Sequence, residues 1–378
     1  MKIKKTILTL LIMISFSTMF GQSNDLNIFG YYQFNYTHFD ISINGNKTRD
    51  VNSFLMQQMN VFFQKNFNSE LSSFVNLEFT NSFSFQDTIG GFKVQEAWLK
   101  YSPSSYFNVK AGVLIPRFNN FNEIKNRTVL LPYIYRPIAY ETYFFSQFGT
   151  GEFVPTSANI QLYGELPVGD AYLNYAVFYG NSETGMLNNN SDFWGQGQDP
   201  TLYKLVGGRL GLEYDNLQLG VSLTQDKKTL NSFHNGRTLI ELGLGNITRT
   251  RLGAYLNYSL EDFELDAEVI KVDYDLSQEN KNSLALNPAN PQNFDKSFYH
   301  ANLLYNITDD LAGYVGYEYL KAEDNFFLNG GLNIYNFGAS YKATGAVLLK
   351  AQYAHQVFKL AGSEGTRNDL LVGASVYF

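Results

Sequence analysis

The segment RLGAYLNYSLEDFELDAEV, residues 251–269, decides the fold. Its apolar side chains stand at alternate positions: Leu252, Ala254, Leu256 and Tyr258 in the first half, and Phe263, Leu265, Ala267 and Val269 in the second. A period of two is typical of a β-strand with one apolar and one polar face. Two such runs around the pair Glu261 and Asp262 predict an antiparallel hairpin.

The same alternation recurs along the whole chain, as in SSFVNLEF (72–79), LQLGVSLTQ (217–225) and LLKAQYAHQV (348–357). Helical periodicity is not found in these segments. Sixteen strands are predicted, and a count of 14 or 18 follows if one boundary is misplaced. They lie near 26–41, 51–66, 71–85, 92–102, 106–115, 156–166, 171–182, 203–214, 217–227, 247–260, 263–275, 297–307, 311–322, 330–342, 346–360 and 368–378.

The connections between these strands alternate between short and long. The short turns are 66–70, 102–105, 167–170, 215–216, 261–262, 308–310 and 343–345, and the longer polar linkers are 42–50, 86–91, 116–155, 183–202, 228–246, 276–296, 323–329 and 361–367. This alternation predicts an all-β fold, a transmembrane antiparallel up-and-down β-barrel with short turns at one end. A β-sandwich does not predict it, and a propeller needs a repeated motif that the chain lacks.

The first residues, MKIKKTILTLLIMISFSTMFGQS, have a basic start, an apolar stretch and then small and polar residues. This layout predicts a signal peptide over 1–21, cleaved before Gln22, and a single barrel domain over 22–378. The chain has no cysteine, which excludes disulfides and thiol-based metal sites. Its formal net charge of −7 gives no reason to expect a nucleic-acid partner.

The segment NDLLVGASVYF, residues 368–378, places apolar or small side chains at alternate positions up to the terminal Phe378. This pattern is similar to the signal that the outer-membrane barrel assembly machinery reads in a last strand. We therefore expect that machinery and outer-membrane lipid as partners, and the cell outer membrane as the location.

A more specific resemblance lies in FNVKAGVLIPRFNNFNEIKNRT, residues 107–128, where a strand with Gly112 leads to Pro116, Phe118 and Glu123. This resembles the passage from the fifth strand to the third loop in the phosphate-selective porin O/P-like superfamily. The GQ pair at 21–22 and RPIAYET at 136–142 are similar to porin-like proteins of the Bacteroidetes type. The resemblance implies a Gram-negative outer-membrane porin and a possible homotrimer. The ladder of arginines and lysines that it implies for phosphate selection does not map onto this chain.

The connection 116–155 is the longest, and connections of this length are usually functional. We expect it to fold into the lumen as a constriction, since in porins the third outer loop often does so. The alternative is a solvated loop on the outer rim. Its aromatic side chains, from Tyr133 to Phe145, either stack against sugars or pack the loop on the wall. The expected constriction and ion-selectivity residues are Arg117, Lys125, Arg127, Arg136 and Glu123.

A second group is expected to line the lumen: Arg209, Arg249, Arg251, Glu264, Asp266, Glu268 and Lys350. Lys100, Lys110 and further acids also face inward in the predicted pattern. The carboxylates at 264–268 form a row on one strand. We expect Arg249 and Arg251 on the preceding strand to pair with this row, as opposite charges do across a sheet.

Enzyme chemistry, metal sites and cofactors are not expected. The four histidines are scattered without a metal-ligand spacing, and no G-x-S-x-G elbow occurs. His300 beside Asn302 is the one pair that merits inspection for a barrel enzyme. The sequence therefore predicts a passive diffusion channel for small polar or anionic solutes. The alternatives are a substrate-specific channel for phosphate or a sugar, and a plugged structural or adhesive barrel.

Overall fold

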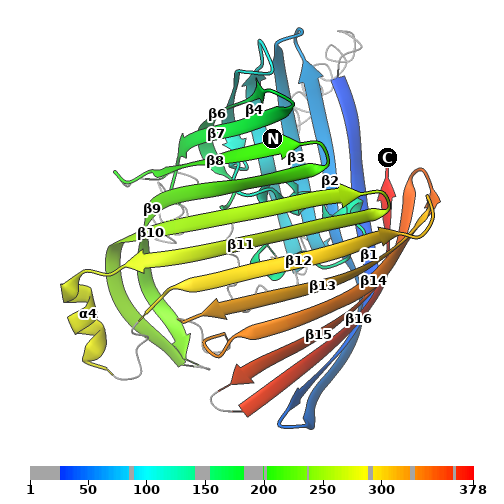
Figure 1. Ribbon diagram of the computed structural model, residues 1–378. Coiled ribbons are helices and arrows are strands. Elements are labelled where there is room, and N and C mark those ends of the chain that lie inside the picture. The colour runs from blue at the N-terminus through cyan, green and yellow to red at the C-terminus, as the bar shows by residue number, and fades with distance from the viewer. Residues whose placement is uncertain are drawn as a thin grey trace, which may run out of the picture.

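The computed structural model describes residues 26–84, 89–140, 154–182, 199, 202–235, 238–287, 293–323, 328–360 and 363–378. Its strands form one closed barrel, in which each strand pairs antiparallel with the strands before and after it (Figure 1). The first and last strands pair along Tyr31–Ile43 and Gly365–Tyr377 and so close the barrel. Closure leaves no open sheet edge, which is the condition for a β-sheet to span lipid.

The strands are β1 Leu26–Ile43, β2 Asn46–Asn66, β3 Leu71–Ser84, β4 Ile89–Tyr101, β5 Asn108–Leu114, β6 Ser157–Val168, β7 Ala171–Gly180, β8 Leu205–Tyr214, β9 Leu217–Asn235, β10 Thr238–Leu260, β11 Phe263–Asp275, β12 Lys296–Asn306, β13 Leu311–Ala322, β14 Leu332–Thr344, β15 Val347–Leu360 and β16 Ser363–Tyr377. The helices are α2 Phe121–Ile124, η1 Lys125–Leu130, η2 Ile138–Tyr140 and α4 Gln278–Ala285. The predicted barrel of sixteen strands is thus confirmed.

Several expected linkers are wrong in part, because strands continue into them, as β4 does into 86–91 from Ile89. Segment 42–50 is a tight turn at Asn44 and Gly45 between β1 and β2. Most of 228–246 belongs to β9 and β10, and β16 begins inside 361–367. Beyond the membrane both faces of a hairpin meet water, so the strands stay paired while apolar alternation is lost. The sequence pattern therefore locates the buried part of each strand and not its full length.

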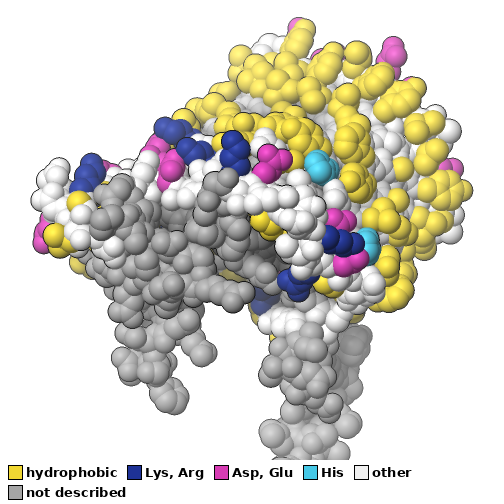
Figure 2. Space-filling model, turned by 90° about the horizontal axis from the view of Figure 1, so that it is seen from below, with side chains coloured by type: hydrophobic (Ala, Val, Ile, Leu, Met, Phe, Trp, Pro, Cys, Tyr) yellow, Lys and Arg dark blue, Asp and Glu magenta, His cyan; other side chains and the backbone are white. Residues whose placement is uncertain are grey.

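The outward faces of the strands are apolar, and hydrophobic side chains gather over the outer wall at the right in Figure 2. Large exposed side chains there include Phe34, Val221, Leu252 and Val372. Aromatic residues form a belt at the short-turn end: Tyr214, Tyr258, Phe263, Tyr305 and Tyr341. A second belt crosses β12 to β14: Tyr299, Tyr317, Tyr319 and Tyr335. An apolar band between aromatic girdles is typical of outer-membrane barrels. Among the described residues, no helix is long and apolar enough to cross a membrane.

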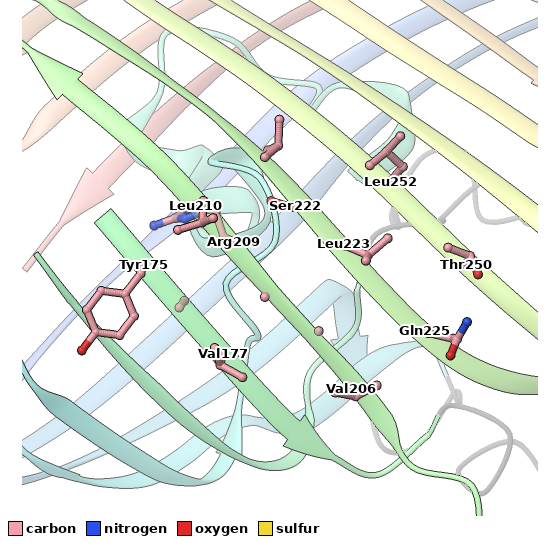
Figure 3. Close-up of a pocket in the computed structure, with 14 residues that line it drawn as sticks. Tyr175, Val177, Val206, Arg209, Leu210, Ser222, Leu223, Gln225, Thr250 and Leu252 are labelled. Carbon is pink, nitrogen blue, oxygen red and sulfur yellow. The ribbon is translucent and has the colours of Figure 1, made fainter. Parts of the chain in front are cut away.

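A groove of about 720 Å³ lies on this outer wall over β7 to β10 (Figure 3). Val177, Val206, Leu210 and Leu223 line it with outward-facing side chains, and Gly208 leaves its floor without one. The groove therefore belongs to the apolar outer face, separate from the lumen.

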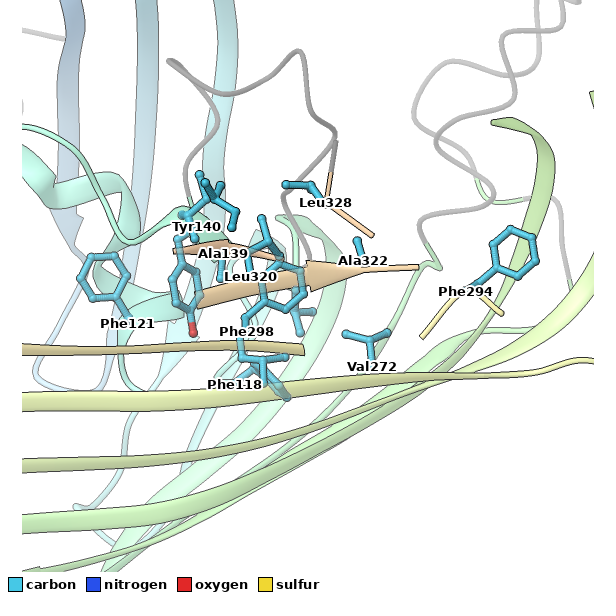
Figure 4. Packing of buried hydrophobic residues seen from close by; sticks show 14 of the residues in the cluster. Phe118, Phe121, Ala139, Tyr140, Val272, Phe294, Phe298, Leu320, Ala322 and Leu328 are labelled. Atoms are coloured by element: carbon cyan, nitrogen blue, oxygen red, sulfur yellow. The ribbon is translucent and has the colours of Figure 1, made fainter. Parts of the chain in front are cut away.

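The largest buried apolar cluster lies inside the barrel (Figure 4). Phe118, Phe121 and Tyr140 come from the connection after β5, and they pack with inward-facing residues such as Phe298 and Leu320. The interior of this barrel is therefore partly filled by its own chain.

Candidate functional site: the lumen segment and the uncovered wall

Residues 115–140, named the lumen segment here, run from the end of β5 through α2, η1 and η2. Two local features set their course. Asn119 adopts a φ of 49°, a left-handed conformation that asparagine tolerates better than most residues. Gly253 on β10 leaves room for the Asn119 side chain, since an added Cβ would lie 2.1 Å from Asn119 Oδ1.

Two wall carboxylates accept hydrogen bonds from the backbone of the lumen segment. Glu268 on β11 accepts from the amides of Asn120 at 2.9 Å and Phe121 at 2.6 Å, and from the Tyr140 hydroxyl at 2.5 Å. Glu318 on β13 accepts from the amide of Ile138 at 2.5 Å. Burial of the Tyr140 hydroxyl beside Glu268 raises its pKa well above the usual value. These bonds satisfy helix-start amides that otherwise have no partner inside the barrel.

Two further wall residues on β15 hold the other half of the segment. Gln352 Oε1 accepts from the amides of Ile134 at 2.7 Å and Tyr135 at 2.9 Å. The Lys350 ammonium lies 3.1 Å from the carbonyl of Thr128 and 3.0 Å from that of Val129. Wall side chains thus replace the water that this backbone would otherwise need.

A charged cluster fixes the start of the segment. Glu123 lies 3.0 Å from the Arg117 guanidinium and 3.1 Å from that of Arg209, which also donates to the carbonyl of Asn119. Burial acts to raise the Glu123 pKa, but the two guanidiniums outweigh it, and the pKa lies below the ordinary carboxyl value. The Arg117 guanidinium also covers the Tyr163 ring at 3.9 Å.

The expected constriction residues take different places. Lys125 is buried, and its ammonium binds Asn122 Oδ1 at 2.8 Å and the carbonyl of Val154 at 2.9 Å. Arg136 is also buried and donates to Gln58 on β2 at 3.0 Å. Arg127 is exposed. The five therefore form no single cluster: two basic side chains hold the segment together, Arg117 and Glu123 pair, and Arg127 faces water.

The acidic row at 264–268 faces inward, but its expected partners are wrong. The short turn between β10 and β11 places Ser259, Asn257 and Tyr255 opposite the three acids. Arg249 and Arg251 lie further along β10, opposite Tyr274 and Val272. Arg249 instead binds Asp226 on β9 through two bonds of 2.9 and 2.6 Å, and Arg251 lies 3.9 Å from the same carboxylate.

His300 Nε2 lies 2.9 Å from Asp266, and the Asn302 amide lies 3.4 Å from the same carboxylate. The His300 ring meets Phe121 and Tyr140 edge to face. Through these contacts, His300 belongs to the part of the wall that packs against the lumen segment. Within the described residues, no group of three or more His, Cys, Asp or Glu side chains is arranged to hold a metal ion.

The lumen segment does not cover the wall evenly. Its described hydrogen bonds go to β1, β2, β6, β8, β9, β11, β13, β15 and β16. On that side the wall side chains are buried, as Glu268 at 4% and His300 at 5% exposure illustrate. On β4 the Lys93 side chain is 52% exposed, and Lys100 and Lys110 remain partly exposed. Solvent therefore reaches the wall at β4 and β5, named the uncovered wall here.

The uncovered wall carries an excess of positive charge. Its cationic side chains and those of the adjoining lumen segment are Lys93, Lys100, Lys110, Arg117 and Arg127, and the acids on it or beside it are Glu78, Glu96 and Glu123. Lys110 lies over the Trp98 ring at 4.3 Å, which holds the ammonium in place. Lys100 and Lys110 sit directly opposite each other on β4 and β5. The sequence pattern placed both facing inward but offered no reason to select them, because it does not show which wall the lumen segment leaves open.

No family model matches the chain, and no curated protein matches it. Solved structures do. The outer-membrane expressed OmpT of Vibrio cholerae is 13% identical, with a TM-score of 0.57 over 94% of this chain and 99% of that one. An anion-selective porin from Comamonas acidovorans is 13% identical, with a TM-score of 0.61 over 93% and 99%. OprB of Pseudomonas putida is 9% identical, with a TM-score of 0.55 over 92% and 94%.

These likenesses establish the fold, a sixteen-stranded barrel of the outer-membrane porin type. They do not confirm the resemblance to the phosphate-selective porin O/P-like superfamily.

Proposed function

We propose that the chain is an outer-membrane porin, in which small polar or anionic solutes diffuse between the lumen segment and the uncovered wall. The barrel and its apolar outer band support a membrane location, since both suit a closed sheet in lipid. The mechanism has no chemical step: the lumen segment sets the size limit, and fixed charges set the ion preference.

The contrast in exposure between the two sides of the lumen carries the proposal. Buried carboxylates and amides hold the lumen segment against β11 to β16, whereas lysines on β4 and β5 keep contact with water. A charged side chain is rarely left in a dry interior without a partner, so these lysines indicate a water-filled passage.

The preference for anions follows from the charges along this passage. Lys93 pairs with Glu78 at 2.9 Å and Glu123 with two arginines, but Lys100 and Arg127 have no described carboxylate partner. Positive side chains at a constriction select anions. The printed title of the Comamonas acidovorans protein, an anion-selective porin, supports the same direction.

The signal peptide, the assembly signal at the last strand and the homotrimer are also proposals. A signal peptide over 1–21 lies outside the described residues. Phe378 exchanges two backbone hydrogen bonds with Gly30 on β1, at 2.9 and 3.0 Å, and its role as an assembly signal remains a prediction. A homotrimer is proposed by likeness, since one similar structure is described as a trimer form of OmpT from Vibrio cholerae.

Single-channel recording of the refolded chain, with the reversal potential in a KCl gradient, tests the proposal. We expect stable current steps and a reversal potential of anionic sign. The double variant K100Q/K110Q should reduce that anion preference, whereas the matched control K65Q/K342Q, which neutralises two lysines at the short-turn end, should change it little.

Two other outcomes of the recording would favour a different function. A correctly folded barrel without current steps would contradict the channel and favour a plugged structural or adhesive barrel. Saturable block by phosphate or by a sugar would favour a substrate-specific channel instead.

A further inference from the structure

The groove on the outer wall over β7 to β10 arises from one missing side chain. Val177, Gly208, Leu223 and Leu252 lie opposite one another in a single row across the four strands, and all four positions face outward. Gly208 is the gap in this row, and it leaves a hollow of about 720 Å³ between Val177 and Leu223. A wall that otherwise presents large apolar side chains therefore has room here for part of another molecule.

The lining of the groove changes from apolar to polar along its length. Leu210 and Val221 line it on the side of the short turns, whereas Gln225 and Thr250 lie opposite each other on the side of the long connections. Figure 3 shows Gln225 and Thr250 together at one end of the groove and Tyr175 at the other. An amide and a hydroxyl can both form hydrogen bonds, so this end suits a polar group.

A positive charge follows directly beyond the polar end. Lys227 lies two positions after Gln225 on the same face of β9, since alternate residues of a strand share a face. Its ammonium lies 4.8 Å from the centre of the Tyr203 ring, a contact that favours a place at the outer surface. At the far rim of the groove, Lys271 on β11 pairs with Asp273 at 3.0 Å. The groove thus leads from apolar side chains through Gln225 to the ammonium of Lys227.

The length of the groove fits one leaflet of a membrane. From Val221 to Gln225 it follows β9 over about 13 Å, at a rise of about 3.3 Å per residue. The hydrocarbon core of a bilayer is about 30 Å thick, so one leaflet contributes about half of that. The polar end points to the long connections, which lie on the outer side in barrels of this kind. The groove therefore belongs to the outer leaflet.

We infer that this groove binds one phosphate-bearing lipid of the outer leaflet. An acyl chain lies beside Gly208, the polar linkage of the lipid meets Gln225 and Thr250, and the phosphate lies at Lys227. The order of chain, linkage and phosphate in such a lipid matches the order of side chains along the groove. The inference requires the membrane location but no open channel, so its failure would leave the proposed function intact.

A second copy of the chain is the alternative occupant. Stable contacts between proteins bury about 1,000 Å² or more, and an apolar hollow alone is a small part of such an area. A contact between copies also gives no reason for the order of polar groups and charge along the groove.

Native mass spectrometry of the refolded barrel, with phosphatidylglycerol added to the detergent, tests the acyl-chain site. We expect one lipid to remain bound to the wild type. In V177W the indole ring lies over the gap at Gly208, and the bound fraction should fall at least about fivefold, the effect of losing contact with one or two methylene groups. The matched control V315W adds the same ring to the outer face of β13 and should retain the lipid. Both valines are exposed, at 56% and 48%, so neither change disturbs buried packing.

The variant K227Q tests the phosphate separately from the chain. It should lower the retention of phosphatidylglycerol about fivefold, the effect of one lysine on an anionic lipid, and leave that of diacylglycerol with the same chains unchanged. The matched control K359Q neutralises an exposed lysine near the end of β15 and should change neither.

Three results would overturn the inference. Equal lipid retention by V177W and V315W would show that the bound lipid belongs to the general lipid shell. Loss of a complex of two or more copies in V177W, with lipid retention unchanged, would assign the groove to a second copy. Equal retention of phosphatidylglycerol by K227Q and the wild type would remove the phosphate from Lys227.

Discussion

Glu123 affects both the charge of the passage and the position of the lumen segment. Its carboxylate bonds to Arg117 on its own segment and to Arg209 on β8. It therefore fastens the beginning of the lumen segment to the wall, and it offsets part of the positive charge beside the uncovered wall.

The Glu123 cluster predicts a dependence on pH. The folded state lowers the Glu123 pKa from its ordinary value of about 4.5, so the stabilisation is complete above that value and is lost as the pH falls through the lower folded pKa. Protonation also leaves Arg117 and Arg209 without their counter-charge. We expect the anion preference, measured as the reversal potential, to rise as the pH falls below about 4.5.

The variant E123Q separates this carboxylate from other acids that titrate in the same range. At pH 7 it should already show a higher anion preference than the wild type, and the difference should disappear in acid. Identical reversal potentials for the two proteins at pH 7 would contradict the role given to Glu123.

At the scale of the elements, the sequence predicted which face of a strand a side chain occupies better than it predicted which residue lies opposite on the neighbouring strand. Alternation alone identifies which residues of β11 face the lumen, because side chains on a strand point to opposite faces in turn. Which residue of β10 lies opposite Glu268 depends on the register that the turn at 261–262 imposes. The expected partners, Arg249 and Arg251, lie six residues and four residues from the correct one, Tyr255.

The position of the lumen segment is less accessible to sequence analysis. The length and composition of 116–155 predicted an element inside the lumen, and residues 141–153 lie outside the described part. The wall residues that bind 117–140 come from strands far apart in the chain, such as Gln58 on β2, Ser222 on β9 and Gln352 on β15. No local pattern marks them, because their role depends on closure of the barrel.

A substitution at Gly253 on β10 tests whether contact with this strand holds the start of the lumen segment in place. In G253V the new side chain would occupy the place of the Asn119 amide, and overpacking of this kind costs about 1–3 kcal/mol. We expect a lower stability of the folded barrel and a noisier single-channel current as the start of the segment moves. The matched control is A254V, whose side chain faces the outer wall on the same strand. Equal current noise in G253V and A254V would show that the segment does not depend on this contact.

At the scale of the whole molecule, the barrel separates an apolar exterior from an interior divided into two parts. One part is filled by the lumen segment and held by buried polar side chains. The other remains in contact with water and carries lysines. The composition shows only a chain with net negative charge, so the positive passage becomes visible only when the strands are placed in the closed barrel.

The central claim, that solutes pass along the uncovered wall, is tested most directly by thiol block of single channels. The cysteine-free chain allows one thiol at a time, in K100C on the uncovered wall and in S340C on the buried side of the lumen. A water-soluble thiol reagent should reduce the current of K100C in discrete steps and leave S340C unchanged. Block of S340C together with an unaffected current in K100C would contradict the account, because it would place the path on the other side of the lumen segment.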